Sequence, residues 1–457
     1  MQLVAYGAQD IYLTGNPQIT FFKVVYRRHT NFAVESIQQT FNGTADFNKR
    51  VTATISRNGD LIQQMYLELI LPNGTVTGTA VAPSPTWTYG IGNAFINYAE
   101  IEIGGQLIDR QYGDWMNIWT ELTIPAGKRD GYDNMVGNAV STTAGGLLTD
   151  QVGGLPLNSA TVTTANQQRL YVPLQFWFNR NPGLALPLIA LQYHEVKLNL
   201  ITRAFADCVQ VYSSTSTASV VNSGTLSCLL YVDYVYLDTD ERRRFAQVSH
   251  EYLIEQVQFT GSQTITNNST NQNITLNFNH PVKELIWAHT SSARATTGTS
   301  NGACSWFNYS GTAVSSTGNP ATVGGVDSCQ TALLQLNGHD RFYVRGSDYF
   351  RKVQNYEHHH RCPRVGADLL GMTTDAKQAS MRQYIYTYSF ALSPEEHQPS
   401  GTCNFSRIDN AVLQLTYDTG IQTALATGNG TLNLNIYAVN YNVLRIMSGM
   451  GGLAYSN

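Results

Sequence analysis

Short stretches of the chain alternate strictly between apolar and polar residues. Residues 51–56, 99–103 and 432–436 each place an apolar side chain at every second position. A period of two is typical of a β-strand that has one face in a core and the other face toward polar surroundings. The dipeptides Asn58-Gly59 and Asn337-Gly338 are expected to supply the positive φ that tight hairpins require. Because the strands do not alternate with long helices, the pattern predicts antiparallel β-sandwiches.

The same series of strand patterns occurs twice. Residues 34–38 (VESIQ) are matched, with conservative changes, by residues 254–258 (IEQVQ). Four further matches follow in the same order. The number of residues between matched positions changes from one match to the next only by amounts that loop insertions would produce. These matches pair Ile55, Asn58 and Leu61 with Leu276, Asn279 and Val282, residues 99–105 with 332–338, residues 196–200 with 413–417, and residues 232–234 with 439–441. Each match is weak by itself, but five in register predict a duplicated β domain of roughly 200 residues.

The length of 457 residues also favours two domains, since a single ordinary core does not grow so large. The matches place an N-terminal arm at 1–26, a first domain at 27–237 and a second domain at 250–445. The charge-rich segment 238–249 is interpreted as the linker, and residues 446–457 as a short C-terminal tail.

Convincing amphipathic helices are few, and long polar insertions interrupt both halves. Short helices are predicted at 112–121 and 375–382. The insertions comprise residues 130–166 in the first half, and residues 290–328 and 358–378 in the second. Loops of this length in compact domains are typically functional surfaces or disordered.

The charge balance argues against direct contact with nucleic acid. The chain has 28 Lys and Arg against 32 Asp and Glu, a formal net charge of −4, whereas a protein that packs nucleic acid is expected to carry a basic arm or face. The clusters at 27–29 and 242–244 are short and are interpreted as surface or inter-domain pairing. The longest apolar stretch, residues 183–191, is about half of the ~20 residues that a spanning helix needs. Residues 1–7 lack the pattern of a signal peptide, so we expect folding in the cytosol, with six free thiols.

The triplet His358-His359-His360, with Cys362 beside it, is the strongest candidate for a metal site. A cupin-type site requires His-x-His followed about four residues later by Glu, but residues 363–365 are Pro, Arg and Val. Three consecutive histidines also cannot all face one metal, so an exposed loop is predicted. Residues 449–454 resemble a dinucleotide-binding loop, but no helix can follow them, which indicates a flexible tail.

Catalytic motifs are equally weak. The chain contains no G-x-S-x-G and no H-E-x-x-H sequence. Residues 395–397 (EEH) are interpreted as a solvated turn, and His194 and Glu195 should point to opposite faces of a strand. We therefore predict no catalytic residue, no cofactor and no metal.

Long blocks of the chain resemble the major capsid proteins of large icosahedral double-stranded DNA viruses, those of the algal phycodnaviruses in particular. The first block is residues 3–43, LVAYGAQDIYLTGNPQITFFKVVYRRHTNFAVESIQQTFNG. Further blocks are SRNGDLI (56–62), EIGGQLID (102–109), PGLALPLIALQYHEVKL (182–198), HEYLIEQVQFTGS (250–262), LNFNHP (276–281), PSGTCNFSRIDNA (399–411) and NYNVLRIMSGMGGLAY (440–455). The three long insertions share no such block.

The resemblance implies a double jelly roll, that is, two tandem eight-stranded antiparallel β-sandwiches with long inserted loops. It also implies a structural protein of the virion capsid, assembled in the host cell cytoplasm. Homotrimers would form pseudo-hexameric capsomers that contact neighbouring capsomers and tile an icosahedral shell over an internal membrane. The N-terminal arm would lie on the inner side, near minor capsid proteins and the membrane.

Outward loops of such proteins in algal viruses carry covalent glycans, often outside ordinary sequons. The candidate acceptors are Asn301, Asn308 and Asn429. Eight N-x-S/T sequons are interpreted as mostly accidental, although they mark expected surface. They begin at Asn42, Asn73, Asn267, Asn268, Asn273, Asn308, Asn404 and Asn429.

Two other functions remain open at this point. Aromatic-rich segments suggest a carbohydrate-binding or carbohydrate-active β-sandwich with exposed rings at Trp87, Tyr89, Trp115 and Trp119. A receptor-binding spike is less favoured, because the blocks of resemblance cover whole domains rather than one tip.

Overall fold

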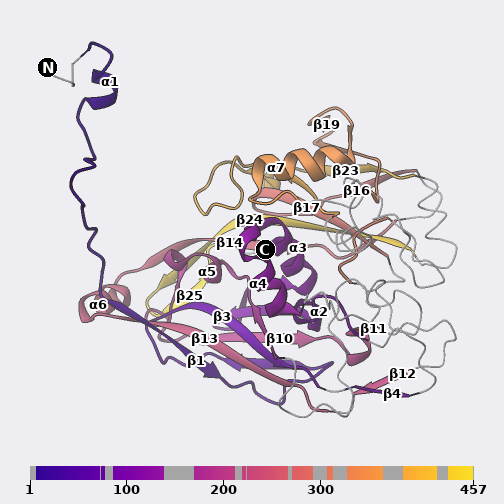
Figure 1. Cartoon of the computed structure of the whole chain (residues 1–457), viewed down its shortest axis with the longest axis horizontal. Helices are drawn as coiled ribbons and strands as arrows, with labels where there is room; N and C mark the ends of the chain where they lie inside the picture. The colour runs from indigo at the N-terminus through magenta and orange to yellow at the C-terminus, as the bar shows by residue number, and fades with distance from the viewer. Residues whose placement is uncertain are drawn as a thin grey trace.

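The computed structural model describes residues 7–72, 74–77, 86–137, 169–210, 219–222, 224–265, 270–291, 306–311, 327–363, 384–418 and 431–455. These residues form two β-sandwiches, one from each half of the chain, with short helices between them (Figure 1). The predicted helix at 375–382 lies outside the described residues.

The first sandwich consists of two antiparallel sheets. One sheet has the order β1 (Phe32–Gln39), β13 (Ser227–Leu237), β3 (Leu61–Ile70) and β8 (Arg169–Pro173), and β9 (Leu186–Pro187) also pairs with β3. The other has the order β2 (Arg50–Thr54), β10 (Val196–Thr202), β6 (Ile96–Ile103) and β7 (Gln106–Tyr112). Two small ribbons pair β4 (Gly74–Thr77) with β12 (Ser219–Asn222) and β5 (Thr86–Trp87) with β11 (Val209–Gln210).

The second sandwich repeats this plan. One sheet has the order β14 (His250–Phe259), β24 (Leu432–Met447), β17 (Pro281–Ser291) and β21 (Tyr386–Ser389), extended by β15 (Gln263–Thr264), β22 (Cys403–Asn404) and β25 (Met450–Leu453). The other has the order β16 (Asn271–Thr275), β23 (Ala411–Thr416), β18 (Thr331–Leu336) and β19 (His339–Asp340), and β20 (Arg345–Gly346) also pairs with β18.

The duplication inferred from the sequence is confirmed by the topology of the two sandwiches. Residues 34–38 and 254–258 lie on β1 and β14, which occupy the same edge position in corresponding sheets. The other four matches fall on the connections β2–β3 and β16–β17, and on the strand pairs β6 and β18, β10 and β23, and β13 and β24. Each pair holds the same place in its sheet order. The two halves are therefore similar in topology as well as in sequence pattern.

The alternating stretches bury the side chains that the pattern assigns to the core. Val51, Ala53 and Ile55 are 3%, 0% and 4% exposed, and the threonines between them are partly exposed. The turn prediction holds at Asn337 and its following glycine, which both have positive φ. At Gly59 the predicted reason, a positive φ, is wrong. Glycine is required there by lack of space, because a Cβ would lie 2.7 Å from Cβ of Tyr234.

Helices connect the sheets. The structure contains α1 (Ile11–Thr14), α2 (Ile91–Phe95), α3 (Gly113–Thr123), α4 (Ala126–Val136), α5 (Trp177–Arg180), α6 (Thr239–Gln247) and α7 (Gln354–His358). Short turns of other helix types are η2 (Pro182–Leu184), η3 (Phe205–Asp207), η4 (Tyr349–Val353) and η7 (Phe405–Arg407). The helix predicted at 112–121 is confirmed as α3. No helix among the described residues has the length and apolar character needed to cross a membrane.

One sequence-based assignment needs correction, and the predicted linker contains a helix that was not predicted. The start of the predicted polar insertion 130–166 is helical, because α4 continues to Val136 and buries Tyr132 and Val136. The linker segment 238–249 is mostly helix α6, whose first backbone N–H, that of Thr239, is bonded to the Asp238 side chain. An acidic N-cap with Glu241 in the first turn is a recognised signal for the start of a helix. The high density of charged residues in this segment instead favoured its interpretation as a linker.

Candidate functional site

The interface between the sandwiches contains an apolar cluster of its own. Helix α3 contributes Trp115, Ile118, Trp119 and Leu122, which pack against side chains of the second sandwich. The partners include Ile286 and Ala288 of β17, Tyr437 and Val439 of β24, and Phe307, Tyr309, Tyr384 and Ile385. Figure 1 places α2, α3 and α4 between the two sandwiches. An interface this apolar favours a fixed rather than a mobile arrangement of the halves.

Charged side chains also join the halves. Arg180 of α5 lies 3.2 Å from Glu255 of β14, and Glu255 lies 2.8 Å from Nζ of Lys283 on β17. The Lys283 side chain is 0% exposed, so its ion pair offsets a large desolvation cost. This network was not predicted from the sequence. The signal was present, because Lys283-Glu284 interrupts the apolar run of β17, and a charge in a buried strand requires a partner.

The histidine triplet lies against this interface. The ring of His359 is completely buried, with Nδ1 2.8 Å from Oε1 of Glu395 and Nε2 3.2 Å from Oε2 of Glu284. The prediction of an exposed loop is therefore wrong for His359, although it holds for His360, whose side chain is 64% exposed. Glu395, which was assigned to a solvated turn, is only 8% exposed because it accepts hydrogen bonds from this segment.

Electrostatics fix the charge state of His359. Burial lowers the pKa of its imidazole, but the charges and hydrogen bonds of Glu284 and Glu395 outweigh burial and raise the pKa to about 9. Burial would raise the pKa of Glu395, yet the hydrogen bonds from His359 and His360 lower it. At neutral pH the His359 ring is thus an imidazolium, held between the side chains of Glu284 and Glu395. Across the described ranges, no group of three or more His, Cys, Asp or Glu side chains could hold a metal ion.

A second buried histidine pairs with a serine inside the second sandwich. Nδ1 of His289 lies 2.7 Å from Oγ of Ser328, and Nε2 lies 3.0 Å from the hydroxyl of Tyr417. A serine beside a histidine is the arrangement of an activated nucleophile. Both residues are 0% exposed, however, and burial lowers the pKa of His289 to about 3. The pair is therefore a neutral hydrogen-bond network between the sheets, out of reach of a substrate.

The C-terminal glycine-rich segment is ordered, contrary to the prediction of a flexible tail. β25 pairs with the end of β24, and the backbone of Gly451 is hydrogen-bonded to the ring of His194 in the first sandwich. A Cβ on Gly449, which has a φ of +79°, would lie 2.6 Å from the ring of Tyr193. The glycines thus allow a tight hairpin to pack on the first sandwich. They form no dinucleotide loop.

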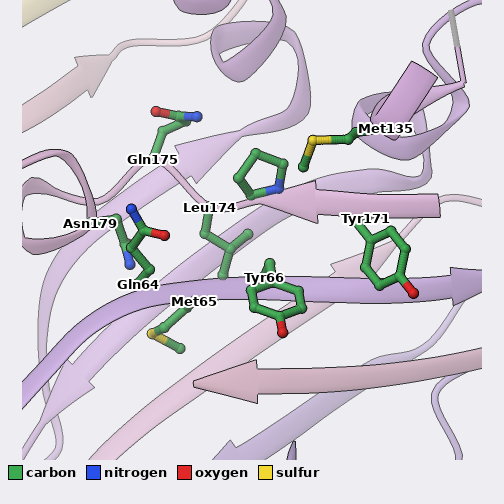
Figure 2. A pocket seen from close by; sticks show the side chains of 9 residues that line it. Gln64, Met65, Tyr66, Met135, Tyr171, Leu174, Gln175 and Asn179 are labelled. Carbon is green, nitrogen blue, oxygen red and sulfur yellow. The ribbon is translucent and has the colours of Figure 1, made fainter. Parts of the chain in front are cut away.

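A surface hollow lies on the first sandwich (Figure 2). It has a volume of about 430 Å³ and lies between strands β3 and β8 and helix α4. Tyr66, Tyr171, Met135 and Leu174 supply apolar surface, and the amides of Gln64, Gln175 and Asn179 supply polar groups. The Tyr66 ring also stacks on that of Tyr231, with centroids 5.3 Å apart.

The N-terminal arm leaves the body of the molecule and carries uncovered apolar side chains. In Figure 1 it runs away from the first sandwich and ends in the single turn of α1. Phe21 and Phe22 are 90% and 99% exposed, and Tyr26 is 85% exposed. Ile11, Tyr12, Leu13, Ile19, Val24 and Val25 are also more than half exposed. So much uncovered apolar surface is typical of a segment that is covered by a partner.

Comparison with known proteins identifies the family. Residues 20–238 match the family model described as major capsid protein N-terminus, and residues 241–379 and 372–452 match that of the large eukaryotic DNA virus major capsid protein. The chain is 51% identical to the major capsid protein of Pyramimonas orientalis virus, covering 100% of this chain and 99% of that protein. The chain belongs to the major capsid proteins of large eukaryotic DNA viruses. It is 46% identical to the major capsid protein of Paramecium bursaria Chlorella virus 1, with the same coverage.

Solved structures agree with this assignment. The crystal structure of PBCV-1 VP54, fitted into a reconstruction of the virophage Sputnik, matches this capsid protein with a TM-score of 0.72 at 40% identity, covering 96% of this chain and 100% of that chain. The Faustovirus major capsid protein matches with a TM-score of 0.66 at 12% identity, covering 97% and 94%, which shows a shared fold. The resemblance recognised in the sequence is confirmed, and the sheet-rich fold is that of viral double jelly roll capsid proteins. The curated relatives are structural proteins of the virion capsid, and this chain is a capsid component rather than an enzyme.

The carbohydrate-binding alternative is not supported for this capsid protein. It required exposed aromatic rings, but Trp87, Tyr89, Trp115 and Trp119 are 0%, 5%, 0% and 4% exposed. Trp115 and Trp119 of α3 and also Tyr89 belong to the interface cluster, and Trp87 packs in the core of the first sandwich. The aromatic enrichment thus reflects packing inside the molecule.

The structure also bears on the glycan acceptors. Asn308 is only 9% exposed, and its Oδ1 accepts hydrogen bonds from the backbone and hydroxyl of Ser310. The expectation that sequons mark surface is therefore wrong at Asn308, because the segment around it packs into the interface cluster. Asn301 and Asn429 lie outside the described residues. Among the other sequons in the described residues, Asn42, Asn273 and Asn404 are exposed.

Proposed function

We propose that three copies of this capsid protein form a pseudo-hexameric capsomer, and that such capsomers tile an icosahedral shell over an internal membrane. The supporting observation is the repeated strand order in the two sandwiches. Three chains with two similar sandwiches each would place six similar walls around one axis, while the two halves remain free to differ in their loops. Each sandwich, delimited at 27–237 and 250–445, would then act as one eight-stranded jelly roll.

The mass of the particle in solution tests this proposal. A trimer of two-sandwich chains should bury more than ~2,000 Å² in total and should therefore persist at micromolar concentration. Size-exclusion chromatography with light scattering should give three times the chain mass of 50.4 kDa. A stable monomer at that concentration would contradict the proposal.

The arm, residues 1–26, is proposed to lie on the inner side of the shell, in contact with minor capsid proteins and close to the membrane. Its exposed aromatic and aliphatic side chains support a role in binding a partner. Cross-linking mass spectrometry on intact virions, using Lys23, tests this placement. Cross-links to minor capsid proteins are expected, and cross-links only to outer loops would contradict it.

Glycans on the outer loops are proposed at Asn301 and Asn429, with Asn308 disfavoured by its burial. Glycopeptide mass spectrometry of virion protein should find modified peptides that contain 301 or 429. A completely unmodified protein would overturn this part of the proposal. The proposed lack of direct contact with nucleic acid agrees with the net charge of −4. Assembly is proposed to take place in the host cytoplasm.

A further inference from the structure

The segment 358–361 contacts both sandwiches. On its second-sandwich side, the His359 ring lies between Glu284 of β17 and Glu395 of the loop before β22. The backbone N–H of His359 also donates to Asn355 at 3.1 Å, and the N–H of His360 donates to Glu395 at 3.0 Å. These contacts hold the segment firmly on the second sandwich.

On its other side, the segment reaches the end of helix α3 through Arg361. The backbone N–H of Arg361 donates to the carbonyl of Leu122 at 3.1 Å, and Nη1 lies 3.2 Å from Oε2 of Glu121. The last carbonyls of a helix have no partner within the helix, so this bond satisfies an otherwise open acceptor. Glu121 is 0% exposed and also pairs with Arg129 of α4.

These contacts adjoin the apolar interface. Leu122 belongs to the cluster that α3 forms with β17 and β24, and Glu284 lies on β17 itself. A segment that is fixed to β17 through His359 and to α3 through Arg361 restrains both surfaces of that interface at once. Apolar packing alone is non-directional, whereas these paired charges and backbone bonds specify one alignment.

We propose that residues 358–361 are an inter-sandwich clasp, in which His359 anchors the segment to the second sandwich and Arg361 holds helix α3 of the first. The clasp keeps the two sandwiches at one angle. Its effect lies within a single chain and does not depend on trimer formation. Only the further consequence, a regular six-walled tile, rests on the proposed capsomer.

Arg361 offers the sharper test, because Glu121 keeps Arg129 as a partner when Arg361 is removed. Arg361→Gln therefore removes the side-chain contact of the clasp with α3, while the backbone bond to Leu122 can remain, and it leaves no buried carboxylate unpaired. His359→Gln breaks the other anchor, and Arg361→Lys keeps the positive charge. Lys352→Gln is the matched control: it removes a nearby cation from the partly exposed pair with Asp348.

Hydrogen exchange measured by mass spectrometry on the native full-length protein reads out the result. In Arg361→Gln, the amides of α3 should exchange about tenfold faster or more, on the scale expected for losing one hydrogen bond to a charged group. Peptides from β13 and β23, in the two sandwich cores, should keep their protection. Arg361→Lys should restore most of the α3 protection, and Lys352→Gln should match the unmodified protein.

Two outcomes would overturn the clasp. The first is α3 exchange in Arg361→Gln that equals that of the unmodified protein. The second is an equal acceleration in α3, β13 and β23, because that would indicate general destabilisation rather than loosening between the halves. Light scattering on the same samples reports trimer formation separately, so failure of the clasp and failure of the proposed capsomer are distinguishable.

Discussion

The carboxylate of Asp109 accepts a hydrogen bond from the backbone N–H of Val257, over 3.3 Å, where strand β7 of the first sandwich meets strand β14 of the second. Gln111 donates to the same carboxylate at 2.7 Å. Asp109 is 3% exposed, and burial outweighs these hydrogen bonds and raises its pKa to about 6. The junction between the halves therefore contains an acid whose ionised form is disfavoured.

Asp109→Asn is expected to stabilise the protein at neutral and alkaline pH. Because the folded-state pKa is raised above the ordinary 3.8, the penalty is absent below that value, grows as pH rises through 6 and is complete above it. The gain should approach about 3 kcal/mol at most, at about 1.4 kcal/mol per pKa unit. Urea unfolding at about pH 4 and pH 8 checks this. Asp409→Asn, on the surface, controls for the lost charge, and an equal gain at both pH values would contradict the prediction.

The His359 cluster should give stability with the opposite dependence on pH. Its folded-state pKa is raised from 6.5 to about 9, so its contribution is complete below about pH 6.5 and is lost as pH rises through 9. The loss should be at most about 3 kcal/mol. His359→Gln should be less stable at pH 6 and should lack this decline in unfolding free energy. His360→Gln, at the exposed neighbour, should keep it; a decline of the same size in His359→Gln would refute the assignment.

Trp115 should be a main determinant of the interface between the sandwiches. It is 0% exposed and lies 5.3 Å, centroid to centroid, from Tyr437 of β24. Trp115→Ala should cost about 3–5 kcal/mol through lost apolar contact and a residual cavity. Trp115→Phe, which keeps a ring, should cost less. Chemical denaturation measures both, and a loss below about 1 kcal/mol in the alanine variant would show that the cluster can collapse around the gap.

Two glycines in helices should respond in opposite ways to alanine. At Gly113, the first residue of α3, a Cβ would lie 2.2 Å from the carbonyl oxygen of Ile96 and 2.4 Å from that of Asn93. Backbone must therefore shift, and Gly113→Ala should lower stability by more than about 1 kcal/mol. At Gly127 of α4, no atom of the described residues lies within 4 Å of an added Cβ, so Gly127→Ala should gain up to about 1 kcal/mol from helix propensity. Thermal unfolding compares them, and equal effects would contradict the steric argument.

Much of the fold could be predicted from the sequence because strand pattern is a local property. The alternation at Val51, Ala53 and Ile55 marks one face of β2 whatever lies opposite, and the repeated order of such patterns marks the duplication. Helix α6 was missed although the acidic N-cap signal at Asp238 was present. The helix signal is local in this segment, but the many charged residues favoured the interpretation as a linker.

The interface could not be predicted in the same way. Nothing near His359 in the sequence indicates that Glu284, which lies on β17, comes within 3.2 Å of its ring. Tryptophan is expected both at a sugar-binding site and in an apolar interface, so the identity of Trp115 and Trp119 does not distinguish these two roles. Asn308 fits a surface sequon equally well until its segment is seen to pack on α3.

The sequence by itself determined the strand pattern, the doubling and the family, because periodicity and residue identity are written along the chain. The tertiary structure decided which charges are buried, which partners they have and how the two sandwiches meet. The physical reason is that burial and pairing arise between strands and helices that are distant in sequence, and the pKa values of His359 and Asp109 depend on those long-range neighbours.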